Sequence, residues 1–197
     1  MRCARDLRNR GTDQVKLILI RHGKTQGNLS GRYIGCRTDE DLCREGIEGL
    51  TGREYPAADK VFSSPMRRCV QTAGILYPGM PVQVVDALRE CDFGDFENKN
   101  YAELNGRADY QAWIDSDGEM PFPGGESRKE FSERCISAFR ETVDGLEDGS
   151  YAFVVHGGTI MAIMEAFAKP QGSYYDFQAR NGEGYILNSG GGYEKLP

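Results

Sequence analysis

The sequence Val15-Lys16-Leu17-Ile18-Leu19-Ile20-Arg21-His22-Gly23 carries the strongest structural signal in the chain. Its first six positions form a mostly apolar, branched run, and charged, polar and glycine positions follow at once. A short apolar run that ends at glycine is typical of a strand buried on both faces of a sheet. It therefore predicts a central strand over 15–20, with Arg21 and His22 at its carboxyl end.

Other strands and helices alternate with this one along the chain. Strands are predicted over 60–62, 82–85, 152–155 and 184–187, the last at a sheet edge, and helices over 66–76, 127–146 and 159–168. Between residues 127 and 146 the apolar side chains recur every three or four positions, which is the period of one helix face. A weaker helix is predicted over 101–114, broken by Gly106. The alternation predicts a three-layer α/β/α sandwich with a mostly parallel central sheet.

The length of 197 residues fits one domain with an ordinary hydrophobic core, which we expect over residues 15–197. Residues 1–14 contain four arginines, but no apolar run follows that is long enough to complete a signal peptide. They are expected to form a flexible extension. The glycine-rich tail over 190–197 is likewise expected to be loose.

The composition limits the classes of function. The 24 Lys and Arg against 30 Asp and Glu give a net charge of −6, which argues against nonspecific nucleic-acid binding. No stretch approaches the ~18 apolar residues of a membrane span, so a cytoplasmic protein without membrane contact is expected. The six cysteines have no CxxC spacing and are expected to be reduced. Two histidines with scattered carboxylates predict no metal site and no cofactor.

Both histidines follow predicted strands and precede glycine, in His22-Gly23 and His156-Gly157-Gly158. Parallel strands bring their carboxyl ends to one edge of the sheet, where ligands bind. Arg21 precedes the first histidine, and Arg67-Arg68 opens a helix. Guanidinium groups match the geometry of phosphate oxygens. Because a helix dipole disfavours cations in the first turn, two arginines at a helix start indicate a function. We take Arg67 as an ordinary exposed side chain and Arg68 as part of an anion pocket.

Three other kinds of chemistry lack their signatures here. The chain has no GxxxxGK[ST] phosphate loop, no GxSxG nucleophile elbow and no HExxH zinc motif. What remains is an anion pocket built from two histidines and at least two arginines.

Five segments, in order, resemble the motifs of the histidine phosphatase superfamily, also called the phosphoglycerate mutase-like family. They read Arg21-His22-Gly23-Lys24-Thr25-Gln26-Gly27-Asn28, Ser63-Ser64-Pro65-Met66-Arg67-Arg68, Leu88-Arg89-Glu90, Pro123-Gly124-Gly125-Glu126-Ser127 and His156-Gly157-Gly158-Thr159-Ile160. A single RHG tripeptide would be a weak match, whereas five ordered motifs over residues 15–160 are a strong one. The resemblance implies the phosphoglycerate mutase-like fold.

The resemblance also implies a role for each catalytic residue. His22 would be the nucleophile that accepts the phosphoryl group. Arg21, Arg68 and His156 would bind the phosphoryl oxygens. Glu90 would be the general acid that protonates the leaving alcohol. None of these roles needs a metal.

Further positions follow from the same comparison. Thr25, Asn28 and Gly157 would contact the substrate or support the residues that do. The chain departs from the family pattern where Phe96-Glu97-Asn98 replaces the usual Trp-Glu-Gly, and where Asp41 replaces a common proline. These departures alter the expected shape of the substrate loops and leave the chemistry unchanged.

The resemblance favours a phosphatase over a mutase. Only 65 residues separate Glu90 from His156, which leaves little material for the lid that a mutase needs to keep water from phosphohistidine. A shallow site and hydrolysis of a small phosphorylated metabolite are expected. The stretch Gly31-Arg32-Tyr33-Ile34-Gly35 resembles members assigned to α-ribazole-5′-phosphate. A mutase and a phosphate-binding module without catalysis are the alternatives, and the oligomeric state stays open, a homodimer included.

Several aromatic residues are candidates for a pocket that takes a ring. They are Tyr33, Phe96, Tyr101, Tyr110 and Trp113. For any one of them, packing in the core is the simpler explanation.

Overall fold

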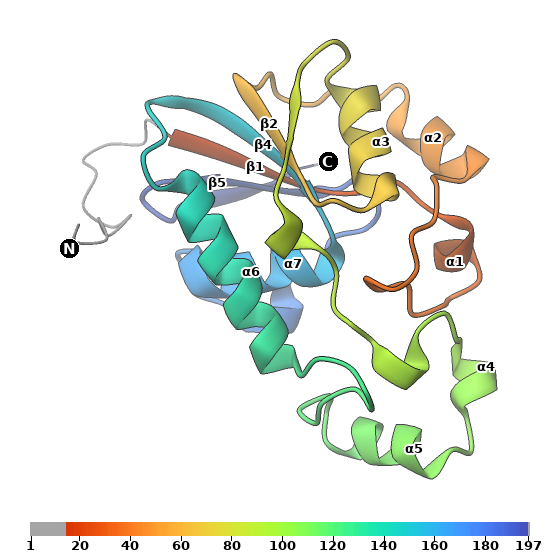
Figure 1. Cartoon of the computed structure of the whole chain (residues 1–197). Coiled ribbons are helices and arrows are strands. Elements are labelled where there is room, and N and C mark those ends of the chain that lie inside the picture. The colour runs from red at the N-terminus through yellow and green to blue at the C-terminus, as the bar shows by residue number, and fades with distance from the viewer. Residues whose placement is uncertain (1–14, 197) are drawn as a thin grey trace.

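The computed structural model describes residues 15–196, which contain a six-stranded sheet in the order β3-β2-β4-β1-β5-β6 (Figure 1). The strands are β1 Val15–Arg21, β2 Lys60–Ser63, β3 Val82–Val84, β4 Gly149–Val155, β5 Gly184–Asn188 and β6 Tyr193–Leu196. Strands β1 to β4 pair in parallel, while β5 runs antiparallel to both β1 and β6. The prediction of an α/β fold with a mostly parallel central sheet is confirmed.

Helices cover both faces of this sheet. They are α1 Gln26–Leu29, α2 Arg44–Leu50, α3 Arg67–Leu76, α4 Tyr101–Leu104, α5 Ala108–Asp115, α6 Arg128–Val143 and α7 Gly157–Phe167, with 3₁₀ turns at Asp86–Leu88, Gly94–Phe96 and Tyr174–Phe177. Figure 1 shows α2 and α3 on one side of the sheet and α6 and α7 on the other. Leu17 and Leu19 of β1 pack into the core under α6 and α7, and Ile18 and Ile20 pack into the core under α3. Alternating side chains of one buried strand thus fill both layers.

Helix α6 is defined by its first turn and by one apolar face. The Ser127 hydroxyl accepts from the backbone N–H of Glu130, whose carboxylate accepts from the N–H of Ser127. This reciprocal capping satisfies two N–H groups at the helix start. The buried face carries Phe131, Cys135, Phe139 and Val143.

A third apolar cluster lies beyond the end of the sheet. Figure 1 shows α4 and α5 there, away from the strands. Phe96, Leu104 and Tyr110 are buried in this cluster together with Phe131 of α6. The helix predicted over 101–114 is observed as two pieces, because Gly106 at φ +85° turns the chain between them.

The C-terminal tail differs from its prediction. Residues 193–196 form β6, which pairs with β5 and buries Leu196, so the expectation of a loose tail was wrong. For the same reason β5 is not an edge strand. The glycines that indicated looseness form a hairpin turn, in which Gly191 has φ +93°.

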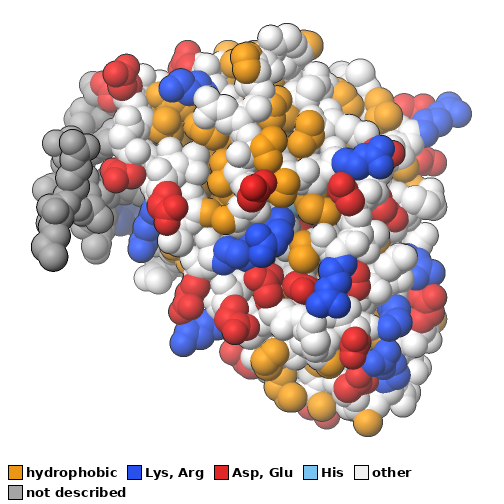
Figure 2. Space-filling model, in the orientation of Figure 1, with side chains coloured by type: hydrophobic (Ala, Val, Ile, Leu, Met, Phe, Trp, Pro, Cys, Tyr) orange, Lys and Arg blue, Asp and Glu red, His pale blue; other side chains and the backbone are white. Residues whose placement is uncertain are grey.

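The charge pattern, the cysteines and the helices of the described residues can be compared with the expectations from composition. Residues 1–14, predicted to be a flexible extension, lie outside them. Within 15–196 the free cysteines are Cys36, Cys43, Cys69, Cys91 and Cys135. No helix of this part is long and apolar enough to cross a membrane. Figure 2 shows acidic and basic side chains interspersed over one face of the molecule.

Candidate active site

Both histidines lie at the carboxyl edge of the sheet, after neighbouring strands. β1 and β4 are parallel, and their last residues, Arg21 and Val155, are paired. His22 and His156 come next, and their ring centroids lie 5.2 Å apart in an edge-to-face arrangement. β2 ends on the other side of β4, and Oγ of Ser64 lies 2.7 Å from Nε2 of His156. The topology brings three distant segments to one site.

His22 is held with one ring nitrogen free. Its Nδ1 donates a hydrogen bond to the carbonyl oxygen of Gly23 at 2.6 Å, because a carbonyl can only accept. Nε2 therefore carries the lone pair. Burial and the charges of Arg68 and Arg21 lower the pKa of His22 well below its usual range. The imidazole is consequently neutral near pH 7 and suited to nucleophilic attack.

Two guanidinium groups, of Arg21 and Arg68, flank the histidines. Arg68 donates to the carbonyl oxygens of Thr38 at 2.9 Å and Gly35 at 3.0 Å, and Arg21 donates to that of Ala179 at 2.8 Å. Among residues 15–196 neither Nε has a hydrogen-bond partner. Buried donors without partners are rare, and oxyanions are the ligands that guanidinium groups bind best.

Gly157 allows Arg21 to lie against the start of α7. A Cβ at this position would come within 3.3 Å of Cζ of Arg21. α7 has no acidic residue in its first turn and no side-chain cap at its N-terminus. Its first N–H groups therefore add to the positive potential beside Arg21.

Glu90 and His156 complete the polar set. Oε2 of Glu90 lies 3.9 Å from Nδ1 of His156, and Oε1 accepts from the N–H of Cys91 at 2.9 Å. Burial raises the pKa of Glu90, although Arg68 and Arg21 oppose the shift. Burial and nearby positive charge lower the pKa of His156. The site thus favours a protonated carboxyl beside neutral imidazoles.

Thr25 and Asn28 support the turn after β1 and do not line the cavity described below. Each side chain accepts from the other's backbone N–H, which caps the short helix α1. Asn181, which no sequence motif singled out, donates its Nδ2 to the carbonyl oxygen of His22 at 3.0 Å and to Oδ1 of Asn28 at 3.2 Å. A residue far along the chain therefore fixes the turn that carries His22.

Arg67, the first residue of α3, pairs with Asp41 of the loop between α1 and α2. Nη2 of Arg67 lies 2.7 Å from Oδ2 of Asp41, and its N–H donates to Oδ1 of Asp39 at 2.8 Å. α3 has no side-chain cap at its own N-cap, and Asp39, in the loop between α1 and α2, supplies an acceptor for its first N–H. The Arg67 side chain is exposed, as expected, yet it is paired. Asp41, in place of the usual proline, links this loop to the helix of Arg68.

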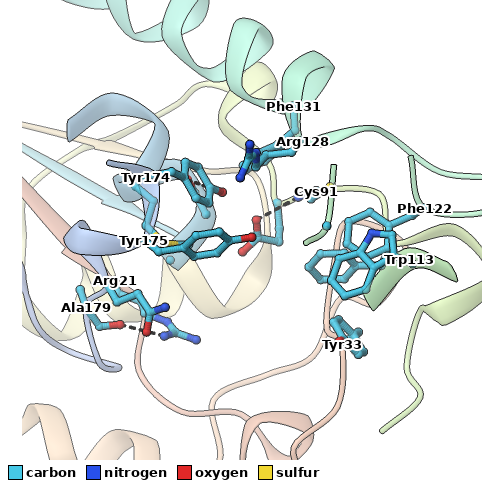
Figure 3. Close-up of a pocket in the computed structure, with 17 residues that line it drawn as sticks. Arg21, Tyr33, Cys91, Trp113, Phe122, Arg128, Phe131, Tyr174, Tyr175 and Ala179 are labelled. Atoms are coloured by element: carbon cyan, nitrogen blue, oxygen red, sulfur yellow. Dashed lines mark hydrogen bonds between the residues drawn. The ribbon is translucent and has the colours of Figure 1, made fainter. Parts of the chain in front are cut away.

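A cavity of about 310 Å³ adjoins the polar site (Figure 3). Arg21, Glu90 and Arg128 are its charged lining residues. The aromatic lining consists of Tyr33, Phe93, Trp113, Phe122, Phe131, Tyr174 and Tyr175. Figure 3 shows Tyr174 and Tyr175 on one side and Trp113 and Phe122 on the other.

The aromatic candidates from the sequence separate into three groups. Tyr33 and Trp113 line the cavity, Phe96 and Tyr110 are buried in the third cluster, and Tyr101 is 62% exposed. The segment between Glu90 and His156, expected to leave the site shallow, builds one aromatic wall of this cavity. Of the two short helices in this segment, α5 contributes Trp113 to the wall, and Phe93 and Phe122 come from the loops.

Comparison with known proteins decides the family. Residues 17–196 match the model of the histidine phosphatase superfamily, branch 1. The chain belongs to this superfamily. A relative is the 2,3-bisphosphoglycerate-dependent phosphoglycerate mutase of Cytophaga hutchinsonii, 31% identical over 75% of this chain and 75% of that one. Another is the adenosylcobalamin/alpha-ribazole phosphatase of Salmonella typhimurium, 27% identical over 85% of this chain and 87% of that one.

A solved structure of the superfamily shares the fold over nearly the whole chain. It is the alpha-ribazole phosphatase from Shigella flexneri, with a TM-score of 0.78 and 26% identity over 92% of this chain and 94% of that chain. Phosphatases and mutases both stand among the relatives, so membership supports an enzyme that handles phosphoryl groups. Within residues 15–196 no three His, Cys, Asp or Glu side chains converge as they would to hold a metal ion.

Proposed function

We propose that the protein is a phosphomonoesterase that acts through a phosphohistidine at His22. The observation that carries this proposal is the convergence of a neutral, oriented imidazole with two buried guanidinium groups and a carboxyl group of raised pKa. A transferring phosphoryl group needs positioning and stabilisation of charge on its oxygens, which Arg21, Arg68 and His156 supply.

The reaction follows in two steps. Nε2 of His22 attacks phosphorus, the bond from phosphorus to the leaving oxygen breaks, and the proton of Glu90 passes to that oxygen. Water then attacks the phosphohistidine, the P–N bond breaks, and Glu90 takes the proton from water. Inorganic phosphate leaves, and Glu90 is again protonated.

The cavity favours hydrolysis over transfer between phosphoglycerates. A glycerate presents a carboxylate, which needs a cationic partner. Beyond the catalytic groups the charged lining residue is Arg128, whose guanidinium is paired with Glu119 and packed over the ring of Tyr174. The remaining lining is largely aromatic, so the alcohol part of the substrate is expected to be flat and apolar. Among phosphorylated metabolites, α-ribazole-5′-phosphate fits this description, and two similar proteins carry that name.

Phosphate release from a panel of esters tests the proposal. The panel contains p-nitrophenyl phosphate, α-ribazole-5′-phosphate, 3-phosphoglycerate, sugar phosphates and nucleoside monophosphates, assayed in chelator with wild type beside His22→Ala. Release that depends on His22 supports the proposal. No release from any ester by a folded protein that binds phosphate would contradict it and favour a mutase or a binding module.

Removal of an exposed cavity aromatic is expected to lower selectivity for aromatic esters. Tyr175 lines the cavity and is 50% exposed, so Tyr175→Ala leaves the core intact. Loss of one stacking partner, worth about 1 kcal/mol, is expected to lower kcat/KM about fivefold for nucleoside monophosphates and leave glycerol 3-phosphate unchanged. Tyr101→Ala, an exposed aromatic outside the cavity lining, is the matched control. Equal losses on both esters would contradict an aromatic binding role.

The pKa shifts predict a bell-shaped pH dependence of kcat/KM. His22 must be neutral to attack, and its lowered pKa places the acid fall well below the range of an ordinary histidine. Glu90 must be protonated, and its raised pKa places the alkaline fall above the range of an ordinary carboxyl group, with activity lost as the pH rises through it. In Glu90→Gln, assayed with phenyl phosphate, whose leaving group needs the acid, the alkaline fall is expected to disappear. Its persistence would contradict the assignment.

A further inference from the structure

Glu90 lies in a segment that has no regular secondary structure. Residues 89–93, between the 3₁₀ turns Asp86–Leu88 and Gly94–Phe96, belong to no helix or strand. Side chains from elsewhere must therefore supply many of the hydrogen bonds that fix this backbone. Arg134 of α6 and Glu126, just before α6, do so.

Arg134 binds the carbonyl oxygens that lead up to and include Glu90. Its Nη1 donates to the carbonyl oxygens of Ala87 at 2.7 Å and Arg89 at 3.1 Å, and its Nη2 donates to that of Glu90 at 3.4 Å. One planar guanidinium can span several acceptors at once, which a lysine ammonium cannot do with the same geometry.

Glu126 holds the other side of the segment. Its Oε2 accepts from the N–H of Asp92 at 2.9 Å, and its own N–H donates to the carbonyl oxygen of Asp92 at 2.9 Å. The carboxylate also accepts from Nε of Arg134 at 2.8 Å and from Nη2 at 2.7 Å. The two side chains are only 16% and 20% exposed, so this bidentate pair is shielded from solvent.

The carboxyl group of Glu90 moves with this segment. Its Oε1 accepts from the N–H of the next residue, Cys91. On another side Oε1 abuts Gly158, where a Cβ would lie 3.0 Å away. A shift of the backbone at 90–91 is therefore passed directly to the proton donor.

We propose that Arg134 and Glu126 are positioning residues that hold the carboxyl group of Glu90 at the leaving oxygen of the substrate. The role rests on the proposed function, in which Glu90 protonates the leaving group. Neither residue lines the cavity, so the pair acts through the backbone of residues 87–92. We call this pair with its backbone contacts the acid clamp.

Esters with different leaving groups distinguish an effect on the position of the Glu90 carboxyl group from a general loss of protein stability. Phenolate leaves poorly without a proton, whereas p-nitrophenolate leaves without one. Arg134→Ala is expected to lower kcat/KM about 30-fold for phenyl phosphate, since misplacement on the order of 1 Å can cost about 100-fold and a general acid contributes about 100-fold or more. For p-nitrophenyl phosphate a loss of only about threefold is expected, because little of that transition state depends on the acid.

Two further variants sharpen the measurement. Arg134→Lys keeps the positive charge and loses the planar set of guanidinium donors. It is expected to show the same unequal loss as Arg134→Ala. That result would assign the effect to hydrogen-bond geometry, since the charge is unchanged. Arg140→Ala, on the same helix with its guanidinium over Phe167, is the control and is expected to leave both esters unchanged. Glu90→Gln sets the reference for complete loss of the acid.

The outcomes separate failure of the clamp from failure of the proposed function. Equal losses on both esters in Arg134→Ala, with unequal losses in Glu90→Gln, would overturn the acid clamp alone. Equal losses in Glu90→Gln would show that Glu90 is not the acid and would overturn the acid clamp, while phosphate release that depends on His22 would still support the proposed function. If wild type cleaves neither these two esters nor any ester of the panel above, the proposed function fails, and hydrogen exchange then tests the clamp. Faster exchange at the amides of Cys91 and Asp92 in Arg134→Ala supports it, and unchanged exchange overturns it.

Discussion

His22→Ala is expected to lower kcat/KM for every phosphomonoester by about 10⁵-fold, the scale on which loss of a nucleophile acts. The side chain is buried at the end of β1, and its Nδ1 donates to the carbonyl oxygen of Gly23, which leaves Nε2 as the nucleophilic nitrogen. The second imidazole cannot substitute, because Nε2 of His156 is bonded to Ser64. Steady-state kinetics on p-nitrophenyl phosphate measure the effect.

Phosphate binding distinguishes loss of chemistry from loss of the fold. Arg21 and Arg68 remain in His22→Ala, so competitive binding of inorganic phosphate and a cooperative thermal transition are expected to persist. Residual turnover within tenfold of wild type would contradict the assignment of His22 as nucleophile.

Arg68→Ala is expected to cost about 10³-fold in kcat/KM, comparable with removal of an arginine that stabilises phosphoryl transfer. The guanidinium is fully buried and bonds the carbonyl oxygens of Thr38 and Gly35, so the variant also loses part of the loop that shapes the site. A lower melting temperature is expected together with the lower activity. Kinetics and thermal unfolding of the same preparation measure both.

The neighbouring arginine is a matched control for Arg68. Arg67 is exposed and paired with Asp41, and an exposed ion pair contributes about 0–1 kcal/mol. Arg67→Ala is therefore expected to lower the melting temperature slightly and to leave kcat/KM unchanged. Equal losses of activity in the two variants would contradict a direct role for Arg68 in binding the phosphoryl group.

The sheet and the polar site were predictable from sequence because both depend on local signals. Buried parallel strands are continuous apolar runs, and the residue after each strand falls at the ligand-binding edge. His22 and His156 could be placed together on that basis, and the structure brings their rings to 5.2 Å. Arg68 stood out because a cation in the first turn of a helix opposes the dipole.

The supporting residues were not predictable in the same way. Asn181 and Arg134 act through contacts made across long sequence separations, and neither residue type is unusual at its position. Strand β6 was not predicted, because the glycines Gly190 to Gly192 indicated a loose tail. Their role as a turn becomes visible only through the pairing of β6 with β5. The aromatic cavity likewise depends on how α4 and α5 pack beyond the sheet.

Direct detection of the phosphoenzyme tests the account most directly. The protein is mixed rapidly with ³²P-labelled phenyl phosphate, quenched in alkali, in which phosphohistidine is stable, and digested for mass spectrometry. We expect one phosphoryl group on His22, formed before steady state and lost at a rate at least as fast as turnover. Release of phosphate without any phosphoenzyme, or a phosphoryl group on a residue other than His22, would contradict the account.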